Sequence, residues 1–404
     1  MVTRDKVKGV KSRWMTAARH TNRSLAVCLS FVLAACSTPA VKEEKPEPEE
    51  PVQSKAAPRP NLKVAAVGDI MLGSDFPKHR LPADDVSLLT PVAEVLRSAD
   101  ITFGNLEGVL QDGGEPVKHC NNPASCYLFR TPARYAEHLK EAGFVVMSLA
   151  NNHARDFGEQ GRDSSMANLQ QMGIAHTGRD GDYASLTVNG LRVGVIAFAP
   201  YQGSNNMLDE EEARRRVEML DAEHDIVIVS FHGGAEGANS TRIPFDREIY
   251  HGEDRGDVVE FARMAVDAGA DLVLGHGPHV PRALELYQER LIAYSLGNFA
   301  TYWGINISGV NGLAPILNAE LSAEGKFLDG RIVSARQMRP GGTVPDEKHA
   351  AARMIRELTL SDFPHTPLDI DQRGNIRLVM PTAVSGAPPA TQPNSDSPAI
   401  VRAE

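Results

Sequence analysis

Short apolar runs alternate with amphipathic stretches along the middle of this chain. Continuous apolar runs bounded by turn residues are typical of strands covered on both faces, and they occur at 62–67, 145–149, 193–198, 226–231 and 272–274. Between them, apolar residues recur at helical spacing, often with a glycine at the end that suits a helix C-cap. The predicted helices are 88–98, 132–142, 162–172, 210–222 and 258–268. This alternation predicts a layered α/β fold.

The pattern changes after residue 282. The runs 283–287, 291–295, 316–321 and 330–335 are short and separated by turn residues, so we expect hairpin strands that add antiparallel pairs to the same domain. The sequence shows no internal repeat. We therefore expect one α/β domain over residues 61–384, a layered sheet sandwich flanked by helices.

Two segments outside this domain have a different composition. Residues 36–60 are rich in Lys, Glu, Pro and Ala without apolar periodicity, and residues 385–404 are rich in Pro, Ser and Ala. Such segments bury too little apolar surface to offset the entropy of ordering them. We expect a disordered tether and a disordered tail.

The first 35 residues have the pattern of a secretory signal peptide. Basic residues precede an apolar run at 25–35, which is too short to span a bilayer as a stable anchor. The run ends Leu33-Ala34-Ala35-Cys36, which resembles a lipobox, so Cys36 is the expected lipidation site and new N-terminus. We expect an exported protein anchored at Cys36 to the cell envelope, at the outer membrane if the source has one. An uncleaved anchor helix is the alternative, and translation could begin at Met15 instead of Met1.

The charge of the chain excludes one class of partner. The formal net charge is −10, and without residues 1–35, which hold seven Lys/Arg and one Asp, 35 basic and 51 acidic residues leave −16. A surface this acidic repels phosphate backbones, so nucleic acid is not an expected partner.

Cys120 and Cys126 are the two cysteines that remain for the folded domain. They lie in one polar loop, and in an oxidising compartment we expect them to form a disulfide, which for so small a loop contributes about 2 kcal/mol. Metal ligation is the rival interpretation, and it is weaker because no second cysteine pair exists.

Residues with metal-ligand chemistry follow the predicted strands directly. Parallel strands of an open sheet place their carboxyl ends at one edge, where such folds build their sites. A lone Asp at such a place is usually a helix N-cap, but the set as a whole predicts a site. Its carboxylate, carboxamide and imidazole groups suit Zn, Mn or Fe rather than Ca. The groups are Asp69, Asn105 with Glu107, Asn151-Asn152-His153, His232, and His276 with His279.

These motifs resemble the CapA-like proteins, the poly-γ-glutamate capsule synthesis family, which is related in fold to calcineurin-like metallophosphatases. The resemblance runs from about residue 61 to 300 and more loosely to 340. It rests on the motifs Gly68-Asp69-Ile70-Met71-Leu72-Gly73, Asn105-Leu106-Glu107, Leu149-Ala150-Asn151-Asn152-His153 with Asp156 and Gly158, Gly275-His276-Gly277-Pro278-His279-Val280, and Tyr294-Ser295-Leu296-Gly297-Asn298-Phe299.

The resemblance implies roles for these residues. It makes Asp69 and His279 ligands of a first metal and Glu107 a carboxylate bridging to a second. The second metal would also be bound by Asn152, His232 and His276. His153 resembles the general acid of phosphatases, with Asp156 as its orienting partner. Asn105, Glu236 and Asn298 would face substrate or support the ligands, although for Asn105 and Asn298 backbone capping in loops is an equal alternative.

This chain departs from the family pattern at three places. His232-Gly233-Gly234-Ala235-Glu236-Gly237 keeps the His and Glu of the family motif but lacks its two aromatic residues, which predicts a wider pocket. Ser74 stands where the family commonly has Arg, so Lys78, His79 or Arg80 would have to supply that anion contact. Met71 stands where phosphatases have a ligand His, so a site with one metal ion and a site with two both remain open.

Three functions remain open from the sequence. The first is a metal-dependent envelope enzyme in synthesis, release or attachment of an anionic polymer such as poly-γ-glutamate, with the basic triplet Arg214-Arg215-Arg216 or the metal drawing the polyanion in. The second is a periplasmic phosphoesterase acting on a small phosphate ester. The third is a non-catalytic scaffold of a membrane polymer-synthase complex.

Overall fold

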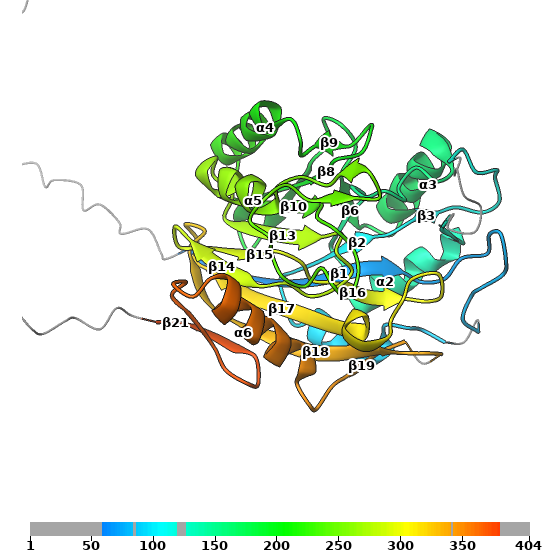
Figure 1. The fold of residues 1–404 in the computed structure, drawn as a ribbon. Coiled ribbons are helices and arrows are strands. Elements are labelled where there is room, and N and C mark those ends of the chain that lie inside the picture. Colours follow the sequence, from blue (N-terminus) through cyan, green and yellow to red (C-terminus); the bar gives the residue numbers. More distant parts are fainter. Residues whose placement is uncertain (1–58, 84–85, 119–126, 341, 380–404) are drawn as a thin grey trace, which may run out of the picture. The chain divides into compact units, whose positions relative to one another are not determined.

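Two mixed β-sheets packed face to face form the body of the protein (Figure 1). The computed structural model describes residues 59–83, 86–118, 127–340 and 342–379, all within one unit, Ala57–Glu404. Among these residues, no helix is both long and apolar enough to cross a membrane. The predicted signal peptide, Cys36, nearly all of the predicted tether, Cys120, Cys126 and the predicted tail lie outside the described residues.

The first sheet has the order β20-β21-β18-β17-β1-β2-β5-β6, with β16 beside β1 and β19 beside β18. β1 runs parallel to β2 and β16 but antiparallel to β17. Its strands are β1 (Leu62–Met71), β2 (Ile101–Leu106), β5 (Val146–Ser148), β6 (Ala175–Thr177), β16 (Asn298–Thr301), β17 (Leu313–Leu321), β18 (Phe327–Met338), β19 (Gly342–Pro345), β20 (Leu368–Ile370) and β21 (Asn375–Leu378).

The second sheet has the order β14-β15-β13-β10-β8-β7, with β9 beside β8. Its strands are β7 (Ala184–Val188), β8 (Leu191–Ala199), β9 (Asn205–Asn206), β10 (Ile226–His232), β13 (Leu272–His276), β14 (Leu284–Tyr287) and β15 (Arg290–Ala293). Two small ribbons pair β3 (Val109–Leu110) with β4 (Arg130–Thr131) and β11 (Ile249–Tyr250) with β12 (Glu253–Asp254).

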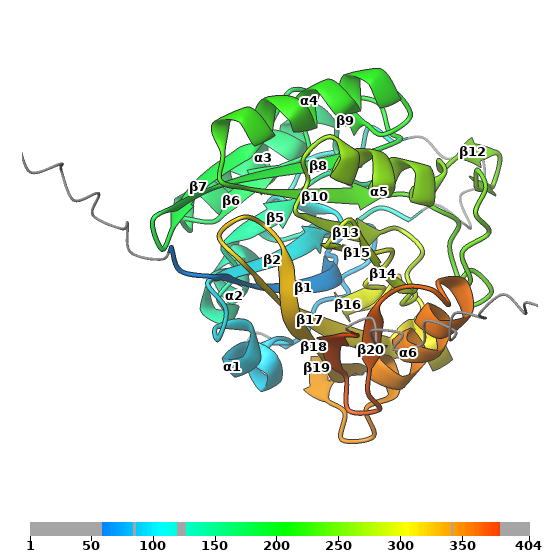
Figure 2. The ribbon, with the colours of Figure 1, turned by 90° about the vertical axis from the view of Figure 1, so that its left-hand side faces the viewer.

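Helices cover the outer face of each sheet, so the layers read helix, sheet, sheet, helix (Figure 2). α4 and α5 pack on the second sheet, α1, α2 and α3 pack on the first, and α6 contacts β14, β17 and β18. The helices are α1 (Ala93–Leu96), α2 (Ala136–Ala142), α3 (Gly158–Gln171), α4 (Glu210–Glu223), α5 (Val258–Asp267) and α6 (Ala350–Asp362), with 3-10 turns at Thr90–Val92, Ala133–Tyr135 and Gly309–Gly312.

The central core lies between the two sheets. Val64 and Phe103 from the first sheet pack with Val195, Ile228 and Leu274 from the second, and all five are almost completely buried. Burying a side chain of this kind contributes about 1.5–3 kcal/mol each, which is why the inner strands are apolar on both faces.

The structure confirms the predicted layered α/β fold, with two differences. The predicted helix at 88–98 shrinks to a 3-10 turn and the four-residue α1, because Pro91 has no backbone N–H and fits only the first turn. The predicted hairpin strands exist as β14–β15 and β17–β18, but each pair extends a different sheet. β15 also pairs in parallel with β13, which makes it an integral strand.

Candidate metal centre

Asp69, Glu107 and His232 form a buried cluster between the carboxyl ends of the two sheets. Asp69 lies near the end of β1, Glu107 directly follows β2, and His232 ends β10. One ligand atom from each residue lies within 4.8 Å of the others, and each residue is at most 1% exposed. The expected convergence of distant strand ends is thus present for these three residues.

A close approach of two chain segments places Asp69. The backbone N–H of Asp69 donates to the carbonyl of Gly297 at 2.9 Å, and a Cβ added to Gly68 would lie 1.9 Å from the same oxygen. Only glycine fits at position 68 for this reason. The N–H of Glu107 donates to the carbonyl of Ile70 at 2.8 Å, which links the second carboxylate to the same strand end.

Asn105 connects the two carboxylates. Its amide nitrogen donates to Asp69 Oδ1 at 2.9 Å and to Glu107 Oε2 at 2.7 Å. Asn151 fixes Asn105 in turn, because its own amide donates to Asn105 Oδ1 at 3.1 Å and to the carbonyl of Leu106 at 2.8 Å. Asn105 therefore supports the ligands, as one of its two expected roles implies, and Asn151 is a supporting residue to which the sequence analysis gave no role.

The two late histidines are placed differently. His279 Nδ1 lies 2.8 Å from Asp69 Oδ2, and although burial lowers its pKa, the Asp69 carboxylate raises that pKa to about 10. His276 pairs through Nε2 with the carbonyl of Val67 at 3.1 Å and through Nδ1 with Ser230 Oγ at 3.3 Å. Burial lowers the pKa of His276, so the neutral ring is favoured. In this arrangement His276 presents no ring nitrogen to the carboxylates, and its predicted ligand role stays a prediction.

Several buried polar atoms of the cluster lack hydrogen-bond partners among the described residues. They are Glu107 Oε1, Asn152 Oδ1 and both ring nitrogens of His232, although His232 Nε2 lies 3.2 Å from Glu107 Oε2. Buried polar atoms are nearly always paired, so unpaired oxygen and nitrogen atoms in one place need an explanation. A divalent cation fits this donor set, because carboxylate, carboxamide and imidazole ligands together suit Zn, Mn or Fe.

The imidazoles control the charge state of Glu107. Burial alone would raise its pKa, but His232, His279 and His153 together hold that pKa well below its usual range. Glu107 therefore stays ionised inside the protein. An ionised buried carboxylate is a ligand for a divalent cation, and binding would displace the protons of the neighbouring imidazole rings.

His153 and Asp156 form a second functional pair at the wall of the adjoining pocket. Asp156 Oδ2 lies 2.8 Å from His153 Nδ1 and also accepts the N–H of Phe129 at 2.8 Å. Lys118 forms an ion pair with Asp156 Oδ1 at 3.2 Å. Because Asp156 engages Nδ1, the other ring nitrogen of His153 is the one available to a substrate.

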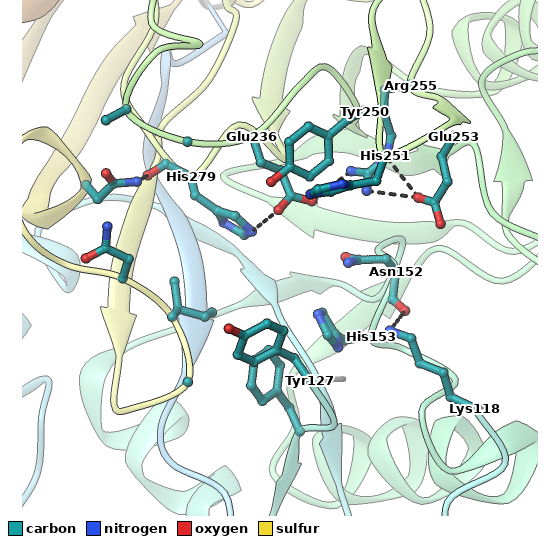
Figure 3. Close-up of a pocket in the computed structure, with 17 residues that line it drawn as sticks. Lys118, Tyr127, Asn152, His153, Glu236, Tyr250, His251, Glu253, Arg255 and His279 are labelled. Atoms are coloured by element: carbon teal, nitrogen blue, oxygen red, sulfur yellow. Dashed lines mark hydrogen bonds and ion pairs between the residues drawn. The ribbon is translucent and has the colours of Figure 1, made fainter. Parts of the chain in front are cut away.

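The pocket next to the cluster has a volume of about 620 Å³ (Figure 3). Asn152, His153 and His279 line it on the side of the metal centre, and Tyr250, His251, Glu253 and Arg255 line another wall. Tyr127 also reaches it. Tyr127 and Tyr250 therefore give this pocket two aromatic side chains from other segments, and the expectation of a wider pocket stays a prediction.

Arg255 is a pocket residue that the sequence analysis missed. Its guanidinium is nearly buried, lies 5.4 Å and 5.3 Å from the ring centres of Tyr201 and Tyr250, and pairs with Glu236 Oε1 at 2.9 Å. Glu236 also reaches towards His279, with 3.8 Å between Oε2 and Nε2. Arg255 follows the two-residue strand β12, which is too short and polar to form an apolar run, so the pattern that revealed the cluster gave no signal for it.

Asn298 supports a loop through its amide nitrogen, while its Oδ1 is buried without a hydrogen-bond partner among the described residues. Its backbone lies beside Asp69 in the parallel pairing of β16 with β1, and its amide donates to the carbonyls of His279 at 3.1 Å, Asn311 at 3.2 Å and Asn306 at 3.3 Å. These bonds fix the loop that carries His279. This is the backbone-capping role that the sequence left open for Asn298.

Comparison with known families gives one broad match. The family described as "Bacterial capsule synthesis protein PGA_cap" matches residues 63–302. The PGA biosynthesis protein CapA of Bacillus subtilis is 28% identical over 303 residues, which cover 70% of this chain and 73% of that protein. The capsule biosynthesis protein CapA of Bacillus anthracis is 29% identical over 262 residues, 59% of each chain.

Solved structures show weaker similarity. A putative 5'-nucleotidase from Staphylococcus aureus aligns with a TM-score of 0.39 at 14% identity, over 74% of this chain and 58% of that one. The 5'-nucleotidase precursor from Thermus thermophilus aligns with a TM-score of 0.35 at 15% identity, over 70% and 54%. This chain therefore spans only a little more than half the length of these structures.

Proposed function

This chain belongs to the bacterial capsule synthesis protein family, and on that premise we propose that it is a metal-dependent hydrolase of the cell envelope that acts on an anionic polymer. The resemblance stated from the sequence motifs is thereby confirmed at the level of the family. The metal, the catalysis and the envelope location are proposals, and the buried cluster with its unpaired donor atoms is the observation that carries them.

The residues divide into two groups by their chemistry. Asp69, Glu107 and His232 would hold the cation, with Asn152 and His279 at its margin. A bound divalent cation would supply Lewis acidity to an oxygen of the substrate and to water at neutral pH.

In this proposal, His153 is the general acid. Asp156 fixes the ring through Nδ1, so His153 can donate a proton from its other nitrogen to the leaving group. Lys118 and Arg255 line the same pocket and could donate hydrogen bonds to an anionic group, although their charges are balanced by Asp156 and Glu236.

The proposal is tested by assaying turnover in a His153→Ala variant. We expect turnover to fall by about 10²–10⁴-fold with bound metal unchanged, because the general acid is lost and the ligands are not. His365→Ala, which changes an exposed histidine, is the matched control and should keep full activity. Substrates are an anionic capsule-type polymer and an aryl phosphate, with metal content measured in parallel.

The outcomes separate the alternative functions. Turnover of the phosphate ester alone would favour the small-molecule phosphoesterase. If the protein binds metal but shows no turnover that depends on His153, the remaining hypothesis is a non-catalytic scaffold of a polymer synthase. Unchanged polymer turnover in His153→Ala would contradict the role given to this histidine.

We also propose export and lipid anchoring at Cys36. The lipobox-like tetrapeptide that ends at Cys36 supports this proposal, as does the composition of residues 36–60, which suits a tether between a membrane and the folded domain. A lipid anchor would hold the pocket near a membrane-bound synthase.

A further inference from the structure

An exposed tryptophan near the pocket contacts two arginines. The guanidinium carbon of Arg80 is 5.0 Å from the ring centre of Trp303, and that of Arg339 is 5.2 Å from it. Both distances lie in the range of attractive cation–π contacts. The indole is 42% exposed, so it is not a core residue.

The backbone holds Trp303 in a conformation that bulky residues rarely adopt. Its φ is +63°, in the left-handed region that favours glycine. Such conformations persist only where the surroundings impose them, and they are frequent at ligand sites. Here the two stacked arginines hold the indole in place at the surface.

This stack adjoins the pocket that contains His153. Gly304, Ile305 and Asn306, the three residues that follow Trp303, line that pocket. Arg339 donates from its guanidinium to the carbonyl of Ile305 at 2.7 Å. Arg80 pairs with Ser74 through two backbone hydrogen bonds, in the loop that follows β1 and Asp69. The stack therefore borders the lining of the pocket at residues 304–306, and we call it the rim stack.

The two arginines of the stack differ from the basic triplet on α4 in their ion pairing. Within the described part of the chain, no carboxylate forms an ion pair with Arg80 or Arg339. The triplet Arg214-Arg215-Arg216 is different, because each of its arginines pairs with an acidic side chain of α4 or with Asp180. The triplet is thus a poor docking patch for a polyanion, and the rim stack is a good one in a protein this acidic.

The cleft is also longer than the pocket itself. A second cavity of about 420 Å³ shares four lining residues with the pocket, Lys118, Asn152, Glu253 and Arg255, and none of the segment 304–306. The rim stack and this second cavity adjoin different parts of the pocket. An extended chain could therefore occupy both while it passes His153.

We propose that Arg80, Trp303 and Arg339 form a subsite that binds carboxylates of an acidic polymer chain as it enters the pocket. The inference rests on the proposed function, because it assumes that the same pocket processes the polymer. Each guanidinium offers a planar pair of N–H donors to a carboxylate, and the part of the indole that remains exposed offers apolar surface to the aliphatic part of the chain.

The fluorescence of Trp303 can report binding at the proposed subsite. The chain has two tryptophans, Trp14 and Trp303, so Trp14→Phe leaves Trp303 as the only indole. The probe is a γ-linked oligoglutamate, titrated while Trp303 fluorescence is recorded. We expect a saturable change that free glutamate does not reproduce at the same carboxylate concentration.

Charge variants test the arginines. In the Trp14→Phe background, Arg80→Gln with Arg339→Gln should weaken oligoglutamate binding by about tenfold or more, because each lost charge-assisted contact is worth more than a neutral hydrogen bond. Arg80→Gln alone keeps the bond from Arg339 to Ile305 and should give a smaller loss. Arg214→Gln with Arg215→Gln removes the same charge elsewhere and should change binding by less than about twofold.

Three results would overturn the subsite: no fluorescence response, equal losses in both double variants, or equal affinity for polyphosphate, which would refute carboxylate recognition. The readout needs no turnover, so this test and that of the proposed function can fail separately. Saturable binding in a protein without hydrolase activity would refute the proposed enzymatic function but support the subsite. Turnover of the polymer without a fluorescence response of Trp303 would support the enzymatic function but refute the subsite.

Discussion

Asn105 is the residue on which the geometry of the candidate metal centre depends most. One amide nitrogen donates to both Asp69 and Glu107, so their facing oxygens are held at hydrogen-bond distance from a common point. Without that donor, two buried carboxylates so close together would repel each other in the metal-free protein. Asn105 thus keeps the ligands in position before any cation binds.

Replacing this amide should weaken metal binding without removing a ligand. We predict that Asn105→Ala lowers the affinity for Mn²⁺ or Zn²⁺ by about 10–100-fold, as is typical for the loss of a residue that orients ligands. Calorimetric titration of metal into the metal-free protein measures it. Asn168→Ala on α3 is the control, and equal affinities in the two variants would contradict the role of Asn105.

Sequence reasoning at the level of single residues succeeded where a strand end defined the position. Asp69, Glu107 and His232 follow apolar runs, so their meeting at one sheet edge could be predicted. The orientation of His276 could not be predicted, because the carbonyl of Val67 and the hydroxyl of Ser230 set it in three dimensions. Arg255 and Tyr250 reach the pocket from a segment that has no apolar periodicity.

At the scale of elements, the contact between β1 and the segment before β16 positions Asp69. Gly68 has no space for a side chain at this contact, because the carbonyl of Gly297 would lie 1.9 Å from an added Cβ. At this contact the backbone of Gly68 faces the backbone of Gly297, so no flexible side chain can move aside. The packing of these segments and the position of Asp69 are therefore coupled.

We predict that Gly68→Ala lowers the free energy of unfolding by about 3 kcal/mol or more and weakens metal binding. Gly173→Ala is the comparison, since nothing lies within 4 Å of its added Cβ and only its φ of +75° is unfavourable, which costs about 1–2 kcal/mol. Urea unfolding of both variants measures this. A smaller loss for Gly68→Ala than for Gly173→Ala would contradict the close approach.

Asp271, which precedes β13, makes the stability of the second sheet depend on pH. It accepts the N–H of Val227 on β10 at 2.8 Å and pairs with Arg290 at 2.9 Å, yet burial raises its pKa to about 6. The unfolded chain has a lower pKa for this group, near 3.9, so the folded state binds the proton more tightly. The contribution of Asp271 to stability is therefore full at low pH and is lost as the pH rises towards 6 and above.

An Asp271→Asn variant should reveal this titration. As the pH rises from 4 to 7, we predict that the wild type loses about 1–3 kcal/mol of unfolding free energy relative to the variant, in which position 271 no longer titrates. Urea unfolding at several pH values measures the difference, and other titrating groups cancel in the comparison. A difference that stays constant over this range would contradict the raised pKa.

The elements themselves could be predicted from apolar runs and helical spacing, but their arrangement could not. The apolar runs that became β1, β5, β8, β10 and β13 are continuous because each is covered on both faces. The assignment of β14–β15 and β17–β18 to different sheets depends on contacts between residues far apart in the chain, which a local pattern does not contain.

At the scale of the whole molecule, the net acidic charge repels a polyanion, whereas the arginines beside the pocket attract it. The chain beyond residue 35 carries a net charge of −16, which repels a polyanion at long range. Arg80 and Arg339 provide local positive charge beside the pocket, whereas Lys118 and Arg255 are paired with carboxylates. Anchoring at the envelope would help, because a high local concentration of polymer makes long-range attraction unnecessary.

The proposed anchor gives a prediction of its own. In a bacterium that lipidates exported proteins, the wild type should be found in the membrane fraction with an acylated N-terminus at Cys36, whereas Cys36→Ala should leave that fraction. Fractionation and mass spectrometry of the purified N-terminus measure both. Recovery of the wild type with residues 1–35 still attached would contradict the signal-peptide assignment.

The central claim is that Asp69, Glu107 and His232 bind a divalent cation. The most direct measurement is elemental analysis of the purified protein after saturation with Mn²⁺, Zn²⁺ or Fe²⁺ and removal of free metal, for the wild type, for Asp69→Asn with Glu107→Gln, and for the surface control Glu218→Gln with Glu223→Gln. We predict about one or two ions per chain in the wild type and the control, and nearly none in the cluster variant. A wild type without metal, or a cluster variant that binds as much as the wild type, would contradict the account.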